Sequence, residues 1–132
     1  MTWFYKNAEI DESILNEYVG FVYEITNLVD GRKYIGKKLL KKTKTKQVNG
    51  KKKKIKVDSD WKTYYGSNRK LNEDVLAMGP DKFYRNILLL CKNKGMCNYH
   101  EAKLQFLHEV LENDNYYNDW IMVKVSRSHV KK

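Results

Sequence analysis

The sequence predicts an α+β fold, in which a small antiparallel sheet of three strands is flanked by helices and carries a basic hairpin inserted after the second strand. Segments 20–27 and 32–38 are rich in β-branched and aromatic residues and flank the turn-forming pair Asp30-Gly31. Residues 83–91 form a largely apolar run, typical of a buried strand. Helix signals before the first of these segments and on both sides of the apolar run place helices around the sheet.

The three helices follow from apolar spacing and from capping residues. Residues 8–18 have apolar side chains at helical spacing, which predicts a short acidic helix. A second helix is expected to begin after Ser67 or Asn68 and to end near Met78, before Gly79-Pro80. A third is expected to begin at Asn98 and to continue to about Glu112, and residues 120–125 are expected to form a final strand or an arm.

The first hairpin concentrates polar groups on one face. A two-residue turn pairs Tyr23 with Lys38 and Asn27 with Tyr34, and side chains on a strand alternate between its two faces. All four side chains therefore share a face that holds two phenols, an amide and an ammonium group. This composition suggests a functional surface, and ordinary strand aromatics are the alternative.

Positive charge is concentrated in the middle of the chain. The protein has a net charge of +10, whereas residues 31–70 alone hold sixteen basic and two acidic residues. Such a segment indicates a polyanionic partner, and we expect residues 37–57 to form a basic hairpin arm, with a disordered loop as the alternative. The expected nucleic-acid contacts are its lysines, together with Trp61 as a stacking residue: Lys37, Lys41, Lys42, Lys44, Lys46, Lys51, Lys52, Lys53, Lys54, Lys56 and Trp61.

Length and composition exclude several classes of protein. The 132 residues suit a single domain, and no apolar run reaches the roughly 18 residues of a membrane span. The first residues lack the pattern of a signal peptide, and two cysteines do not make a disulfide framework. We therefore expect a cytoplasmic protein without a membrane partner or a small-molecule cofactor, and leave its oligomeric state open.

Several motifs in a fixed order carry a resemblance to a known family. The first triplet reads Phe-Val-Tyr, where that family has Gly-Ile-Tyr, but its tyrosine is retained. Over about residues 20–120 the chain resembles the GIY-YIG nuclease superfamily, most closely the small phage-type homing endonucleases of the SegE-like kind. The segments that carry the resemblance are Val22-Tyr23, Tyr34-Ile35-Gly36, Tyr65-Gly66-Ser67, Gly79-Pro80 with Phe83, Glu101, and Tyr117-Asn118.

The resemblance implies a DNA endonuclease that hydrolyses phosphodiester bonds with Mg²⁺ or Mn²⁺, and a host-cell cytoplasmic location if a phage encodes it. Glu101 would hold the metal ion, while Tyr23 would act as the general base or orient it. Phosphate contacts would come from Tyr34 beside Lys38 or Lys37, and from Arg69, for which Lys70 is the alternative. Asn118 would support the site from the end of the domain.

Three alternatives remain open. Asn98 and Glu101 have the spacing of a helix-capping pair, so Glu101 has a structural explanation as well as a catalytic one. A non-catalytic basic nucleic-acid-binding module with the same fold would share the lysine arm. A small structural or ribosome-associated basic protein is a weaker possibility. Only the enzyme would depend on Tyr23, Glu101 and a divalent metal.

Overall fold

The centre of the fold is a mixed sheet with the strand order β2-β1-β7-β3-β4. The computed structural model describes residues 2–122 and residue 127. Neighbouring strands are antiparallel, except that β1 and β7 are parallel. The strands are β1 (Phe4–Tyr5), β2 (Ala8–Glu9), β3 (Gly20–Asn27), β4 (Lys33–Leu39) and β7 (Phe83–Cys91). The predicted α+β class is confirmed.

The sheet has five strands, so the prediction of three antiparallel strands is wrong. The two additional strands, β1 and β2, contain only two residues each, which is too short for an alternating pattern to show. Strand β2 also replaces the start of the helix predicted over residues 8–18. Only the 3₁₀ helix η1 (Glu12–Glu17) forms there, and Asp11 caps it by accepting a hydrogen bond from the Ser13 backbone N–H at 3.0 Å.

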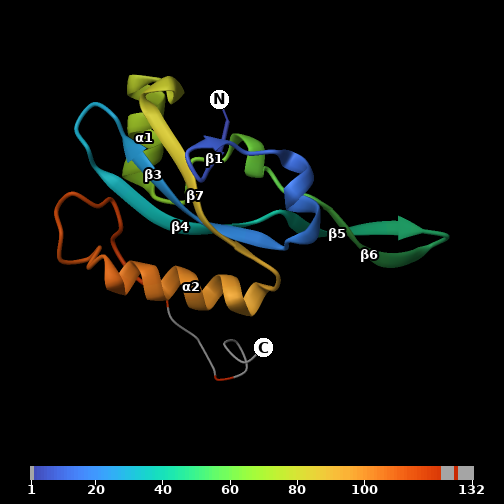
Figure 1. Cartoon of the computed structure of the whole chain (residues 1–132). Coiled ribbons are helices and arrows are strands. Elements are labelled where there is room, and N and C mark those ends of the chain that lie inside the picture. Colours follow the sequence, from blue (N-terminus) through green and yellow to red (C-terminus); the bar gives the residue numbers. More distant parts are fainter. Residues whose placement is uncertain (1, 123–126, 128–132) are drawn as a thin grey trace.

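The helices α1 (Arg69–Met78) and α2 (Lys94–Leu107) lie on opposite faces of the sheet (Figure 1). Leu71 and Val75 of α1 belong to the larger apolar cluster, together with Trp3, Tyr23 and Tyr34. The smaller cluster lies under α2 and contains Val22, Ile35, Cys91, Cys97 and Val110. The central strands therefore bury both faces, with Tyr23 and Tyr34 on the α1 side.

Capping residues determine where the two helices begin. The Asn68 side chain accepts a hydrogen bond from the Leu71 N–H at 2.9 Å, and Gly79, at φ +96°, ends α1, as predicted. At α2 the cap is Asn93, which accepts from the Met96 N–H at 2.8 Å. The predicted start at Asn98 is therefore wrong, and Glu101 lies in the middle of the helix instead of in a capping pair.

The first hairpin has a wider turn than predicted. Asn27 and Arg32 close a four-residue loop, in which the Asn27 side-chain oxygen accepts hydrogen bonds from the N–H groups of Val29 and Asp30. Tyr23 consequently pairs with Gly36, and Phe21 with Lys38. The predicted pairing of Tyr23 with Lys38 is wrong by two residues. A shift of the strand register by two residues leaves each side chain on the same face of the hairpin. Tyr23, Tyr34 and Lys38 therefore still share one face of the sheet.

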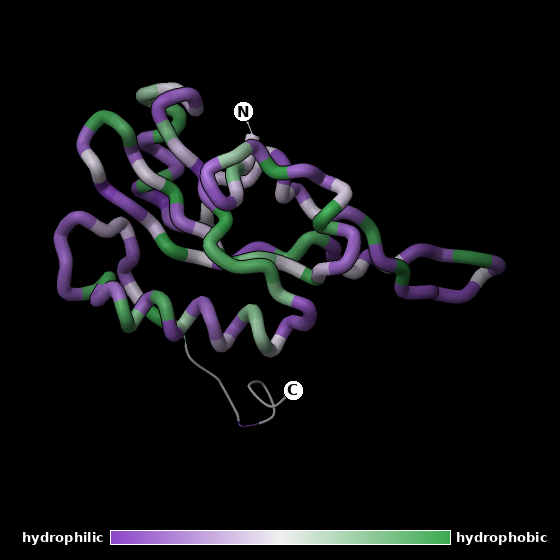
Figure 2. The backbone as a smooth tube through the Cα atoms, viewed as in Figure 1, coloured by the Kyte–Doolittle hydropathy of each residue, from purple (hydrophilic) through white to green (hydrophobic). Residues whose placement is uncertain are grey.

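The basic arm forms the predicted hairpin from β5 (Lys41–Val48) and β6 (Lys51–Asp58), a separate two-stranded sheet. Asn49 and Gly50 have φ values of +52° and +77°, as a type I′ turn requires. The arm projects away from the body of the protein (Figure 1), and most of its backbone is coloured hydrophilic in Figure 2. Its side chains are exposed except for Ile55 and Val57, which are half-buried.

Three smaller segments lie outside the sheets, α1 and α2. They are the 3₁₀ helices η2 (Trp61–Thr63) and η3 (Pro80–Lys82), and residues 120–122. Residues 120–122 form no helix or strand. Residues 123–125 of the predicted final strand or arm lie outside the described residues. Within the part of the chain that the structure describes, no helix is long and apolar enough to cross a membrane.

Candidate active site

A small pocket brings Tyr34 and Glu101 together, although they lie far apart in the sequence. The pocket has a volume of about 170 Å³ and also contains Ser67, Gln105 and Asp119 in its wall. We call it the Tyr34–Glu101 pocket. The hydroxyl groups of Tyr34 and Ser67 are 2.9 Å apart and share a hydrogen bond. Strand β4, the loop before α1 and the middle of α2 thus each supply an oxygen-bearing side chain to one cavity.

Asn118 fixes the strand that carries Tyr34. Its side chain accepts a hydrogen bond from the Ile35 N–H at 3.1 Å and donates one to the Ile35 carbonyl at 2.8 Å. Gln105 of α2 donates to the same carbonyl at 2.9 Å. Because β4 is the edge strand of the sheet, these side chains replace the hydrogen bonds of a missing neighbour. Asn118 therefore holds β4 in place beside the pocket.

Glu101 is half-buried, and its environment favours the protonated form. Burial raises the pKa of its carboxyl group, while the Lys37 ammonium and the Lys37 backbone N–H act in the opposite direction. The Lys37 ammonium also donates a hydrogen bond to the Asn98 side-chain oxygen. Lys37 is thus the cation whose charge acts on Glu101.

Tyr23 is fully buried and is not among the residues that line the pocket. Burial raises the pKa of its phenol well above the usual value, and the nearby groups Tyr64, Tyr34 and Glu101 raise it further. Its ring centroid lies 6.2 Å from that of Tyr34 and 6.1 Å from that of Tyr64. The phenol is therefore neutral near pH 7, because the surrounding protein groups raise its pKa.

The structure does not bring the two candidate cations of α1 to the pocket. The Arg69 side chain is 94% exposed, and its Nε donates to Glu73 at 3.3 Å. The Lys70 ammonium pairs with Asp74 at 3.2 Å. Both cations are therefore engaged by carboxylates on their own helix, and neither is among the residues that line the Tyr34–Glu101 pocket as described.

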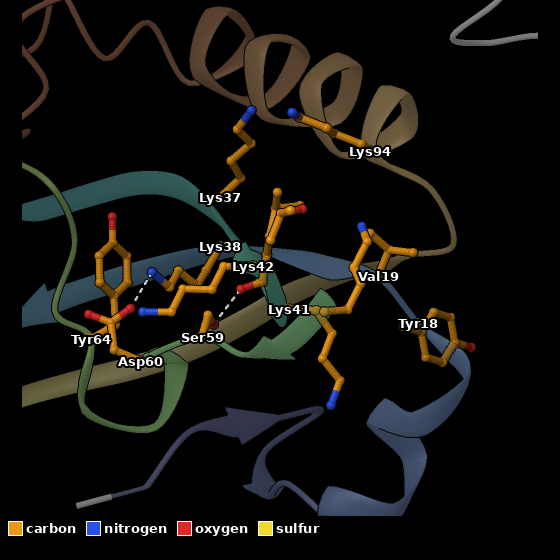
Figure 3. A pocket seen from close by; sticks show the side chains of 13 residues that line it. Tyr18, Val19, Lys37, Lys38, Lys41, Lys42, Ser59, Asp60, Tyr64 and Lys94 are labelled. Carbon is orange, nitrogen blue, oxygen red and sulfur yellow. Dashed lines mark hydrogen bonds and ion pairs between the residues drawn. The ribbon is translucent and has the colours of Figure 1, made fainter. Parts of the chain in front are cut away.

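A larger cavity adjoins the base of the arm. It has a volume of about 650 Å³, and we call it the lysine pocket. Figure 3 shows Lys37 and Lys94 beside α2, and Lys38 with Lys42 near Tyr64 and Asp60. Lys38 pairs with Asp60 at 2.6 Å and lies 3.9 Å from the Tyr64 ring centroid. The basic residues in its wall are Lys37, Lys38, Lys41, Lys42, Lys56 and Lys94.

Trp61 lies in the core, so its ring is not exposed for the stacking on DNA bases that we expected. Its side chain is only 8% exposed and belongs to the larger apolar cluster. Its backbone carbonyl accepts a hydrogen bond from the Trp3 indole N–H at 2.7 Å. Trp61 therefore closes one edge of the core, whereas the arm lysines that were expected to bind nucleic acid are exposed.

Ser67 and Asp119 are among the pocket residues that sequence reasoning did not place at the site. Ser67 was considered as a helix cap and as the end of the Tyr65-Gly66-Ser67 motif but not as a site residue, yet its hydroxyl shares a hydrogen bond with the Tyr34 phenol. The Asp119 carboxylate accepts a hydrogen bond from the Asn68 amide at 3.3 Å. The available signal was their position in the sequence: Ser67 ends the Tyr65-Gly66-Ser67 motif, and Asp119 directly follows Tyr117-Asn118.

The pocket offers the kind of ligands that a hard divalent cation takes. Its wall contains the carboxylates of Glu101 and Asp119 and the hydroxyl groups of Tyr34 and Ser67. Mg²⁺ is commonly held by one or two carboxylates, with water and substrate phosphate completing its shell. Among the described residues there is no group of three His, Cys, Asp or Glu side chains for a metal. The residues present therefore fit a Mg²⁺ or Mn²⁺ ion that retains water, with Glu101 and Asp119 as the carboxylates that could hold it.

Comparisons with known proteins agree with the motif order. The family model described as "Putative endonuclease segE, GIY-YIG domain" matches residues 3–121. The protein named "Putative endonuclease segE" of Enterobacteria phage T4 is 31% identical over 98 residues, which make up 74% of this chain. The chain matches 39% of the length of that relative. No solved structure matches the chain.

Proposed function

The chain belongs to the SegE GIY-YIG endonuclease family, and we propose that it is a divalent-metal-dependent endonuclease that hydrolyses phosphodiester bonds in DNA. The observation that carries the proposal is the placement of Tyr34 and Glu101 in one pocket. The lysine pocket and the base of the arm adjoin the C-terminal end of β4. The positive charge of their lysines attracts a polyanion. A homing role, which the resemblance implies, belongs to the same proposal.

The scissile phosphate is assigned to the Tyr34–Glu101 pocket. The Tyr34 phenol, held by Ser67, donates a hydrogen bond to a phosphate oxygen. The ammonium of Lys37 lies close enough to act on Glu101 and compensates the negative charge that the phosphate brings. Asn118 keeps the edge strand, and so Tyr34, in position through its two hydrogen bonds to Ile35.

Tyr23 is assigned a positioning role in preference to that of general base. A base must reach the attacking water, whereas the Tyr23 phenol is fully buried and its pKa is raised by that burial. Its ring supports Tyr34 from behind, on the same face of the hairpin. When bound at Glu101, Mg²⁺ or Mn²⁺ supplies positive charge to the phosphate and acidifies the attacking water.

The arm is assigned as the principal DNA-binding element. Nine of its lysines lie on β5 and β6, Lys41 through Lys56, and only Lys41 forms an ion pair among the described contacts of these nine. Lys37 and Lys38 extend the positive surface toward the pocket. Such a surface binds phosphates largely without regard to sequence, through the release of counterions.

The alternative function, a binding module without turnover, has one observation in its favour: Arg69 and Lys70 are paired on α1, away from the pocket. A plasmid assay separates the two. The full chain is incubated with supercoiled DNA in Mg²⁺, in Mn²⁺, and in EDTA followed by excess metal. Nicking or linearisation that EDTA stops and metal restores supports the endonuclease. A gel shift without cleavage under all conditions, repeated on genomic DNA of the source, supports the binding module.

A further inference from the structure

The two faces of the arm differ in chemistry, which is visible only once the strand register is known. Cross-strand partners share a face, and successive residues alternate between faces. The register pairs Thr43 with Lys56, Thr45 with Lys54 and Gln47 with Lys52. We call this the Thr/Gln face, and all six of its side chains are exposed.

The opposite face is organised differently. Lys42 pairs with Val57, and Lys44 pairs with Ile55. These two aliphatic residues are the half-buried positions of β6, next to lysine side chains whose long stems can cover them. The arm therefore has one face of uncharged hydrogen-bonding groups beside lysines, and another of lysines beside aliphatic groups.

The chemistry of the Thr/Gln face suits base edges. Gln forms a bidentate pair with adenine, and Thr donates to or accepts from several bases and contacts the thymine methyl group. A two-stranded ribbon fits the major groove of B-DNA. Residues two apart on a strand are separated by about 6.6 Å, close to the rise of two base pairs at about 3.4 Å each. Thr43, Thr45 and Gln47 thus present reading groups at an interval that matches the DNA.

The Thr/Gln face also continues into the site. Thr43 and Lys56 belong to the wall of the lysine pocket, as do Lys41 of the same face, Lys42 of the opposite face, and Lys37, which acts on Glu101. DNA that follows this face therefore leads from the arm to the Tyr34–Glu101 pocket. Each strand of the arm has 8 residues, which corresponds to a length of about 25 Å.

We propose that Thr43, Thr45 and Gln47 read bases in the major groove while Lys52, Lys54 and Lys56 hold the adjacent phosphates. The inference rests on the proposed DNA endonuclease function and adds the source of its sequence preference. The length of the arm corresponds to about seven base pairs, so the recognised bases form a short stretch of DNA on one side of the cut.

The test selects duplexes from a randomised pool in EDTA, so that binding is measured without cleavage. The triple variant Thr43→Val, Thr45→Val, Gln47→Met keeps size and strand preference but removes the hydrogen-bonding groups. The control, Lys44→Met with Lys46→Met, alters the opposite face. We expect the wild-type protein to select a short motif. The triple variant should bind that motif at least about tenfold more weakly and random duplex within about twofold, whereas the control should keep the motif.

The outcomes distinguish failure of the base-reading role from failure of the endonuclease function. A wild-type protein that binds duplex DNA without a motif, or a triple variant that selects the same motif, overturns the inference and leaves the endonuclease proposal standing. A protein that neither binds nor cleaves any duplex overturns the endonuclease proposal, and the inference fails with it. If the control variant loses the motif and the triple variant keeps it, the bases are read by the opposite face of the arm. This result also overturns the inference.

Discussion

The phenol of Tyr23 lies directly over Gly36 on the neighbouring strand. A Cβ atom at Gly36 would come 2.5 Å from the Tyr23 hydroxyl oxygen and 2.8 Å from the ring carbon that bears it. These distances are well inside van der Waals contact, and both strands lie in a packed core. Gly36, the glycine of the Tyr34-Ile35-Gly36 motif, therefore leaves room for the Tyr23 phenol because it has no Cβ atom.

The substitution Gly36→Ala is expected to destabilise the protein by about 1–3 kcal/mol and to reduce cleavage, because Tyr23 must move and Tyr34 packs against it. Denaturant unfolding measures the first effect. In a double-mutant cycle with Tyr23→Leu, the alanine should cost less once the phenol is gone. Equal costs in the two backgrounds would show that the two residues do not interact in this way.

Removing each phenol hydroxyl separately distinguishes their roles. Tyr34→Phe should lower kcat by about 10²-fold or more, because its hydroxyl lies in the pocket and a donor to the phosphate is lost. Tyr23→Phe should have the smaller effect, because its hydroxyl is buried outside the pocket wall. Single-turnover cleavage by the two variants gives the comparison, and the reverse order would restore Tyr23 as the base.

Asp74 should make stability sensitive to acid. Burial raises the pKa of its carboxyl, but hydrogen bonds from Tyr117 and Lys70 and the charge of Arg32 outweigh this and leave the pKa below its usual value. The ionised Asp74 carboxylate therefore stabilises the folded state fully above the unfolded-state pKa of about 3.9. This stabilisation is lost as pH falls through the lower pKa of the folded state. Asp74→Asn should flatten the curve of unfolding free energy against pH below about pH 4. An unchanged curve would contradict this role.

The two faces of the arm should differ in their phosphate contacts. Lys52→Gln with Lys54→Gln removes two charges from the Thr/Gln face, and Lys44→Gln with Lys46→Gln removes two from the other face. The first pair should reduce the slope of log affinity against log salt by about two, and the second by less than about one. Binding titrations at several salt concentrations measure the slopes. Equal slopes would mean that DNA does not distinguish the faces.

Elements with long repeating patterns or clear caps could be predicted from the sequence. Strands β3, β4 and β7, the arm and α1 were found where expected. The two-residue strands β1 and β2 were not, because two residues carry no periodicity. The start of α2 was misplaced because Asn93 and Asn98 are equally good capping types, and only the tertiary structure selects Asn93.

The site was partly predictable for a similar reason. The hairpin register depends on side-chain hydrogen bonds of Asn27, yet an error of two residues kept Tyr23 and Tyr34 on one face. The burial of Trp61 depends on Trp3, 58 residues away in the sequence. The outward direction of Arg69 depends on how α1 rotates against the core. Long-range packing of this kind leaves no local pattern in a single sequence.

The central claim is that Glu101 holds the catalytic metal ion, and plasmid nicking by Glu101→Gln tests it most directly. The matched control is Glu73→Gln, which removes an exposed carboxylate from α1. Burial raises the pKa of Glu101, so the stability linked to its protonated form is lost as pH rises through that pKa, and Gln should fold at least as well at pH 7. Circular dichroism verifies the fold of both variants.

We expect Glu101→Gln to lose at least about 100-fold in nicking rate in Mg²⁺ while Glu73→Gln keeps the wild-type rate. A folded Glu101→Gln protein that nicks DNA as fast as the wild type would contradict the account.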